Sequence, residues 1–152
     1  MSRILILSDD PDEAVQWLTD EDVIRMPIEI AQVLLTVWSK FPDAAKKGVI
    51  TTLVMYPEHV WIPWVEESQE NYIALWNYGM DILDEHEYRF GKRAVNPYRH
   101  GMSKTLDRLQ VIPPLPEGPQ TPYPILPHQA VLMQAELVKV HYSHRDKPTW
   151  KK

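Results

Sequence analysis

The stretch from Trp61 to Arg93 constrains the fold most, because apolar and aromatic residues recur along it at helical spacing. Steps of three and four residues place one set on a single helix face: Trp61, Val65, Tyr72, Leu75, Gly79, Ile82 and Phe90. A second stripe beside it consists of Ile73, Trp76, Met80 and Leu83. So wide an apolar surface is typical of a buried helix. The pattern predicts a long central helix, either continuous or broken near Ser68 into two pieces, with Gly91 as its C-terminal stop.

Two further helices are predicted ahead of the central one. Ser8 or Asp9, with Pro11 close behind, is a good helix start, because a side-chain oxygen caps the first amides and Pro suits the first turn. This first helix would run through Leu18, and the second would extend from about residue 20 to residue 41.

The second helix has a polar stripe at alternating three- and four-residue spacing, formed by Asp22, Arg25, Glu29, Gln32, Thr36 and Ser39. Pro27 interrupts the pattern, so it either kinks the helix or marks the true first turn. Before both helices, the short apolar segment 3–7 predicts one N-terminal strand or an extended arm.

Proline divides the rest of the chain. Residues 43–57 predict an irregular connection, residues 96–109 a helix, and residues 128–144 a last helix. Between these helices, residues 112–127 hold seven of the fourteen Pro residues, which excludes a regular helix. Several apolar residues in this Pro-rich segment favour an ordered, extended strap over a free linker.

With 152 residues, of which 44% are hydrophobic, the chain is expected to form a single domain over residues 1–152 with a substantial core. We therefore predict an all-α fold. The absence of Cys excludes a disulfide scaffold, a thiolate metal site and Cys catalysis. No apolar run approaches the roughly 20 residues that span a bilayer, and the N-terminus lacks a signal-peptide pattern. We expect a soluble, cytoplasmic protein with no membrane partner.

Charge is distributed unevenly along a chain whose net charge is −5. Residues 1–30 contain eight acidic residues and only two Arg. A basic segment begins near the end of the central helix and consists of Arg89, Lys92, Arg93, Arg99, Lys104 and Arg108. This basic segment predicts either phosphate binding or a solvated face that offsets the acidic end.

Polar side chains on the apolar face of the central helix need partners if they are buried. Ser68, Asn71 and His86 lie on or beside that face, and Glu85 forms an i, i+4 pair with Arg89. These residues predict either a structural hydrogen-bond network or a pocket for a small anionic or nucleotide-like group.

In the pocket interpretation, Arg25, Arg89 and His86 are donors, and Glu29 or Glu85 is the acid or base. His141 and His144 have the i, i+3 spacing of metal ligands, but the spacing fixes no third ligand. We therefore predict neither a metal site nor a cofactor.

Several segments resemble the phage pyrimidine-dimer DNA glycosylases of the endonuclease V type. They are the start Met1-Ser2-Arg3-Ile4, the Arg-Met-Pro of residues 25–27, and LPHQAVLMQAELV…KPTW within residues 126–150. Residues 68–72 and 87–92 are similar to a group of uncharacterised phage proteins. That group shares an acidic turn, a basic residue, Met and a Glu three residues on.

The resemblance implies a compact helical domain acting on DNA or a nucleotide. In that family the N-terminal α-amine attacks the sugar C1′ to form an imine, assisted by a nearby Glu. An α-amine, with a pKa of about 8, is partly neutral at physiological pH and so suits this role. Ser2 would supply the amine after removal of Met1. Aligned on Pro27, the family's catalytic Glu falls on Arg25, so Glu21, Asp22 or Glu29 would have to take over its role. The residues expected to be catalytic are Ser2, Arg25 and Glu29.

The residues expected to bind substrate or phosphate are Arg3, His86, Arg89, Lys92, Arg93 and Arg99. The alternative comes from a different class of protein. In it the chain is a non-catalytic phage accessory protein that binds a host protein through an acidic surface, with Glu21 and Asp22 in the contact.

Overall fold

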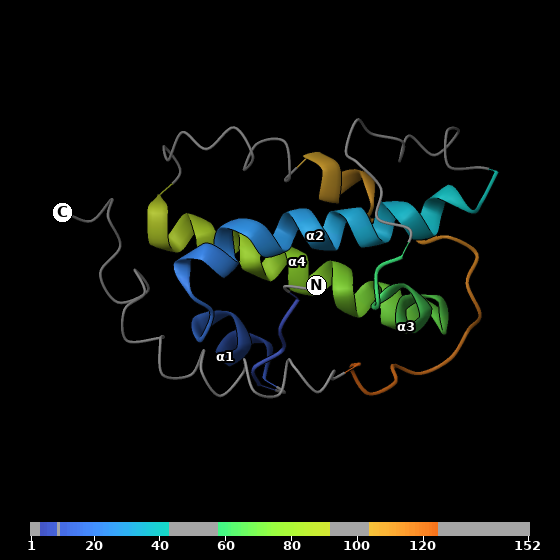
Figure 1. The fold of residues 1–152 in the computed structure, drawn as a ribbon, viewed down its shortest axis with the longest axis horizontal. Helices are drawn as coiled ribbons and strands as arrows, with labels where there is room; N and C mark the ends of the chain where they lie inside the picture. The colour runs from blue at the N-terminus through green and yellow to red at the C-terminus, as the bar shows by residue number, and fades with distance from the viewer. Residues whose placement is uncertain (1–3, 9, 43–57, 92–103, 125–152) are drawn as a thin grey trace.

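The computed structural model describes residues 4–8, 10–42, 58–91 and 104–124, and within them it contains helices and irregular segments but no strand. The helices are α1 (Pro11–Gln16), α2 (Asp20–Ser39), α3 (Ile62–Glu66) and α4 (Gln69–Phe90) (Figure 1). Residues 104–108 add a short helical stretch. The predicted all-α fold with a long central helix is confirmed.

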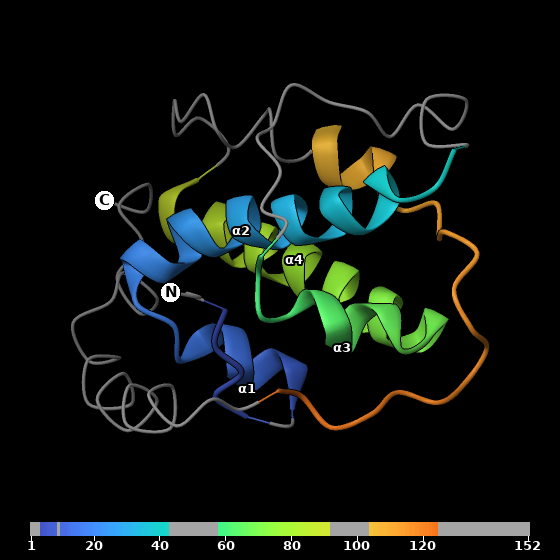
Figure 2. The same ribbon diagram turned by 45° about the vertical axis from the view of Figure 1, so that its right-hand side comes forward.

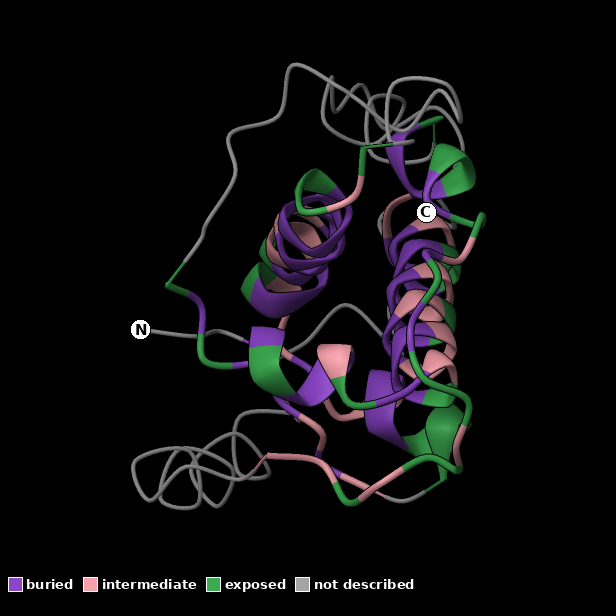
Figure 3. Ribbon diagram, turned by 90° about the vertical axis from the view of Figure 1, so that its right-hand side faces the viewer, coloured by how far each residue is buried: buried purple, intermediate pink, exposed green. Residues whose placement is uncertain are grey.

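The two long helices, α2 and α4, pack against each other and form the centre of the fold (Figures 1 and 2). Helix α3 packs against both of them, and α1 packs against α4. Buried residues concentrate where these helices meet, and exposed residues lie on their outer faces (Figure 3). The largest fully buried side chains include Trp38, Trp61, Arg89, Tyr72, Met26 and Leu75.

Helices α2 and α4 approach each other closely at Gly79. A Cβ atom added to Gly79 would lie 3.1 Å from Ile30 Cγ2 of α2 and 3.4 Å from Leu106 Cδ1. The absence of a side chain therefore lets α2, α4 and the 104–108 stretch meet at one point.

Segment 104–111 is held on α2 and α4 by three aromatic donors. Trp76 Nε1 donates to the Leu106 carbonyl at 2.6 Å, and the Tyr72 hydroxyl donates to the Leu109 carbonyl at 2.6 Å. Trp38 Nε1 donates to the Val111 carbonyl and also to the Tyr72 hydroxyl, both at 3.0 Å. These bonds satisfy one backbone carbonyl in the last turn of the 104–108 stretch and two in the irregular chain that follows it.

The predicted break in the central helix is confirmed, because α3 and α4 are separate helices. Ser68 begins α4 as its N-cap, and its Oγ accepts a hydrogen bond from the Asn71 amide at 3.1 Å. Gly91 ends α4 with a φ of 82°, a conformation that L-residues with a side chain rarely adopt.

The N-cap of α1 lies one residue after Asp9, the later of the two predicted caps. Asp10 is the N-cap, since its side chain accepts a hydrogen bond from the Asp12 amide at 3.0 Å. Ser8 supports this turn by accepting a hydrogen bond from the Asp10 amide and donating one to Glu13. The helix ends at Gln16, before the predicted end.

Helix α2 begins at a capping box that the sequence analysis missed. The Thr19 hydroxyl accepts from the Asp22 amide at 3.2 Å, while the Asp22 carboxylate accepts from the Thr19 amide at 3.4 Å. Pro27 lies inside the helix. The interpretation of Pro27 as the true first turn is therefore wrong.

The N-terminal segment contains no strand over residues 4–7, so of the two predicted forms the strand is wrong. Ile4, Leu5 and Leu7 are buried in the core. The Tyr78 hydroxyl of α4 donates to the Leu5 carbonyl at 2.6 Å, which ties this arm to the central helix.

The described part of the Pro-rich strap, residues 112–124, is non-helical and passes around the end of the molecule where α3 joins α4 (Figures 1 and 2). The Gln69 amide donates to the Pro116 carbonyl at 2.9 Å, and Ser68 Oγ donates to the Pro119 carbonyl at 3.2 Å. The strap is therefore held at the junction of the two helices.

Several predictions lie outside the described residues: the connection 43–57, the start of the helix predicted from residue 96, and the last helix at 128–144. Among the helices that the structure describes, none combines the length and the apolar composition needed to cross a membrane.

Candidate functional site: the Glu29–His59 pair

Glu29, a predicted catalytic residue, faces a histidine that the sequence analysis did not single out. Glu29 lies on α2, and His59 lies just before α3. The distance between Glu29 Oε1 and His59 Nε2 is 2.5 Å. The His59 side chain is 1% exposed and the Glu29 side chain 15% exposed, so the pair lies at the edge of the core.

The start of α3 orients the His59 ring. The Trp61 amide donates to His59 Nδ1 at 3.1 Å, and the Ile62 amide donates to the His59 carbonyl at 3.1 Å. Because Nδ1 accepts a hydrogen bond, the neutral imidazole carries its proton on Nε2. The Nε2–H group then donates to the Glu29 carboxylate.

Glu29 is the member of the pair that retains exposed surface, so a ligand at this site would contact Glu29 rather than His59. A carboxylate held in this way can accept a proton or stabilise a developing positive charge. Arg25 lies one helical turn earlier on α2 and forms an exposed ion pair with Glu21, in which the Arg25 Nε to Glu21 Oε1 distance is 3.4 Å. The two predicted catalytic residues of α2 therefore share one side of the helix.

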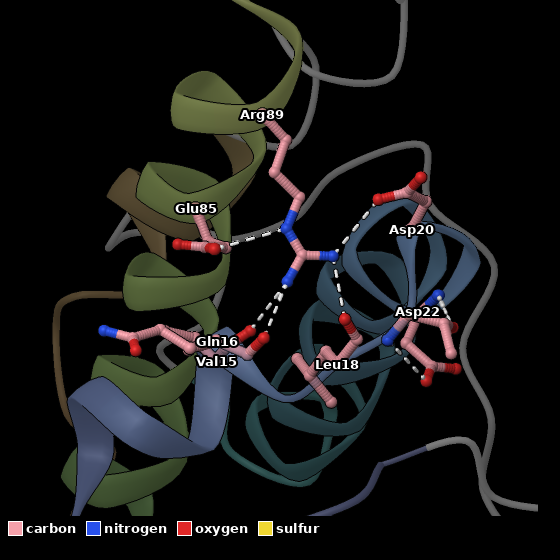
Figure 4. Close-up of polar contacts among 8 residues, drawn as sticks. Val15, Gln16, Leu18, Asp20, Asp22, Glu85 and Arg89 are labelled. Atoms are coloured by element: carbon pink, nitrogen blue, oxygen red, sulfur yellow. Dashed lines mark hydrogen bonds and ion pairs between the residues drawn. The ribbon is translucent and has the colours of Figure 1, made fainter. Parts of the chain in front are cut away.

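Arg89 is not placed to bind phosphate as predicted. Its guanidinium is fully buried between α4, α1 and the start of α2 (Figure 4). Nε donates to Glu85 at 3.2 Å, and Nη1 donates to the Leu18 carbonyl at 2.8 Å and to Asp20 at 3.2 Å. Nη2 donates to the carbonyls of residues 15 and 16 at 3.1 and 3.3 Å.

These contacts use all five N–H donors of the guanidinium. Two carboxylates balance its charge, and three carbonyls at the end of α1 and in the α1–α2 turn gain a partner. This geometry assigns Arg89 to the junction of α1, α2 and α4, which we name the Arg89 junction, and leaves it no donor for a phosphate.

Ser68 and Asn71 contact the strap rather than Arg25 or Glu29. Asn71 Oδ1 accepts from the Thr121 amide at 2.9 Å, and Asn71 Nδ2 donates to Thr121 Oγ1 at 2.9 Å and to the Trp64 carbonyl at 2.7 Å. Thr121 Oγ1 donates to Glu67 at 2.6 Å. These hydrogen bonds hold the strap against the start of α4.

Of the remaining predicted site residues, His86 is buried on α4, with its ring 4.9 Å from the ring of Phe90. The others lie outside the described residues: Ser2, Arg3, Lys92, Arg93 and Arg99. Of the described residues of the predicted pocket, Arg89 and His86 are buried at α4, whereas Arg25 is exposed on α2.

No protein-family model, curated protein or solved structure matches the chain. Within the described ranges, no three His, Asp or Glu side chains are grouped to hold a metal ion. Among the described residues, the Glu29–His59 pair combines a predicted catalytic residue that keeps some exposed surface with a buried partner at a defined distance. No periodic signal in the sequence could have found His59, because it lies 30 residues from its partner.

Proposed function

We propose that the protein is a phage-encoded relative of the pyrimidine-dimer DNA glycosylases that acts on DNA or a nucleotide, with Glu29 as its catalytic carboxylate. The observation that carries the proposal is the 2.5 Å contact between Glu29 and the buried His59. A carboxylate with a fixed position and some exposed surface has the properties of an acid–base group. The resemblance of the N-terminus and of residues 25–27 to that family supports the amine chemistry, with Glu29 replacing the family's carboxylate, whose position is occupied by Arg25.

In the proposed reaction, the N-terminal α-amine bonds to the sugar C1′, and the C1′–N bond to the base breaks. The base leaves with the bonding electron pair and takes up one proton of the amine. The C1′–O4′ bond of the sugar then breaks, O4′ takes up the second proton of the amine, and the C1′=N double bond of the imine forms. On an abasic sugar, the C1′ oxygen leaves as water instead. Glu29 accepts a proton from the amine or stabilises the positive charge that develops at C1′.

The test is a borohydride trap with abasic-site DNA. We expect a covalent protein–DNA adduct with the wild-type protein and none when the α-amine is acetylated. Glu29→Gln should slow adduct formation by roughly 10²- to 10⁴-fold, the range for loss of a general acid or base. Glu70→Gln is the matched control, because it makes the same change at an exposed position in the first turn of α4 and should leave the rate unchanged.

An absence of adduct, together with an absence of salt-sensitive DNA binding, would rule out the lyase chemistry. An adduct that forms equally fast with Glu29→Gln would instead remove Glu29 from the mechanism.

A second candidate function is binding of a host protein through an acidic surface. It is favoured by the charge around Asp81, where burial and then the carboxylates of Asp84 and Asp12 raise the pKa above its ordinary value. Acidic groups from α1 and α4 therefore gather in one region. Asp22 does not belong to such a surface, because it is buried in the capping box of α2, where its carboxylate accepts a hydrogen bond from the Thr19 amide.

Charge reversal tests this candidate. Asp12→Lys with Asp84→Lys should abolish capture of a specific host protein in a pull-down, and Glu70→Lys, at an exposed position in the first turn of α4, is the control. Capture that survives the double reversal would exclude the acidic region as the contact.

A further inference from the structure

We infer that His59 is a positioning residue, which holds the Glu29 carboxylate in one orientation while the Trp61 amide fixes the tautomer of the ring. The inference rests on the proposed function only where it concerns the effect of His59 on the reaction rate. The placement of the Glu29 carboxylate by His59 is a property of the folded chain. His59 itself touches no reacting atom in this scheme.

The tautomer follows from the partners at the two ring nitrogens. The Trp61 N–H points at Nδ1, and the Glu29 carboxylate faces Nε2. Moving the ring proton to Nδ1 would set two N–H donors against each other and turn a nitrogen lone pair toward a carboxylate. Both ends of the ring would then be repulsive, so the Nε2–H form is locked.

Through the two hydrogen bonds of the His59 ring, the backbone at the start of α3 determines the position of the Glu29 side chain on α2. His59 begins the turn into α3 through its carbonyl and its Nδ1, and α3 packs on α2. The ring is almost completely buried, so the packed core limits its rotation.

A free Glu side chain samples many rotamers, and confining it before a substrate binds removes that entropy from the reaction step. The hydrogen bond from Nε2–H to Glu29 is charge-assisted and therefore among the stronger ones in proteins. His59 thus contributes to the preorganisation of the Glu29 carboxylate.

Two substitutions separate positioning from structural support. In His59→Asn, the amide oxygen lies about where Nδ1 was, so the acceptor for the Trp61 amide remains but the donor to Glu29 is lost. In His59→Gln, the amide nitrogen lies about where Nε2 was, so the donor to Glu29 remains but the acceptor for Trp61 is lost.

We expect His59→Asn to keep cooperative thermal unfolding and DNA affinity while the rate of adduct formation falls by roughly 10²-fold, as for a misplaced catalytic group. His59→Gln should lower the melting temperature more and the rate less. The opposite ranking of the two rates, with His59→Asn as fast as wild type, would overturn the inference.

A second measurement does not depend on activity. Nitrogen-15 NMR of the imidazole should show a protonated Nε2 and an unprotonated Nδ1, and the Nε2–H proton should shift upfield in Glu29→Gln, where the carboxylate charge is removed. A protonated Nδ1, or a proton resonance unchanged in Glu29→Gln, would overturn the inference whatever the activity. If the NMR pattern is as expected but no protein forms an adduct, the proposed function and the role of His59 in catalysis are overturned. The failure of the proposed function can therefore be distinguished from the failure of the His59–Glu29 contact.

Discussion

Arg89 stabilises the structure through the geometry of its donors as well as through its charge. Its planar guanidinium donates in three directions, to carboxylates and to backbone carbonyls at the ends of other helices. An ammonium group has three donors at one point and cannot reproduce this fork. A buried carbonyl or carboxylate that loses its partner retains the full cost of its desolvation.

Arg89→Lys should therefore lower the free energy of unfolding by about 3 kcal/mol, although the charge is kept. Denaturant unfolding followed by circular dichroism measures this change. Arg25→Lys is the control, because Arg25 is exposed in a surface ion pair, and its effect should stay within about 0.5 kcal/mol. Equal effects at the two positions would contradict the role assigned to the Arg89 junction.

At this scale the sequence predicts pairs that are local and misses those that are not. The Glu85–Arg89 pair follows from its i, i+4 spacing, and the structure contains it. The other partners of Arg89 are mostly backbone carbonyls, which every residue has and which therefore leave no trace in the sequence. His59 was missed for a related reason, since its partner is brought to it only by the packing of α3 on α2.

At the scale of elements, the strap and α4 are joined by a small number of directional bonds. Thr121 makes most of them, with its amide and hydroxyl bonded to Asn71 and Glu67. Tyr123 adds ring contacts with Trp61 and Trp64, at centroid distances of 6.0 and 5.3 Å. Removal of the hydroxyl should loosen the strap while the helical core stays intact.

Thr121→Val tests this separation, because it preserves the shape of the side chain and removes its hydroxyl. Hydrogen exchange should accelerate at the amide of residue 121, which donates to Asn71, and at the Gln69 amide, which donates to the Pro116 carbonyl of the strap. Amides inside α2 and in the middle of α4 should keep their protection. Uniform acceleration across the protein would instead mean that the strap is part of the cooperative core.

Element boundaries were predictable where one residue carries a strong local signal. Ser68 and Gly91 are such residues, a side-chain cap and a glycine with positive φ. Pro27 gave two interpretations because Pro suits a first turn and also occurs in kinks. The Thr19 capping box excludes Pro27 from the first turn, because it starts α2 two turns before Pro27.

At the scale of the whole molecule, the net charge of −5 includes a carboxylate whose ionisation opposes folding. The pKa of Asp81 is raised above its ordinary value of 3.8, first by burial and then by Asp84 and Asp12. The folded state therefore binds this proton more tightly than the unfolded state. The contribution of Asp81 to stability is then favourable at low pH and is lost as pH rises through the folded-state pKa.

Asp81→Asn should raise the free energy of unfolding at pH 7, and the gain should shrink as pH falls toward and below 3.8. Denaturant unfolding at a series of pH values measures the difference from wild type. Asp107→Asn, at an exposed position in the 104–108 stretch, should give a smaller change with no such trend. A gain that grows as the solution is acidified would contradict the direction of the Asp81 shift.

The Arg89 junction also affects the order of events during folding. Its bonds to Leu18, Asp20 and the end of α1 join residues separated by 69 to 74 positions in the chain. They can form only after α2 and α4 are built and packed, because loop closure over such a distance needs other contacts to compensate its entropy. We therefore expect the junction to form after the folding barrier is crossed. Its loss would speed unfolding more than it slows folding, so Arg89 sets the lifetime of the native state more than the speed at which it is reached.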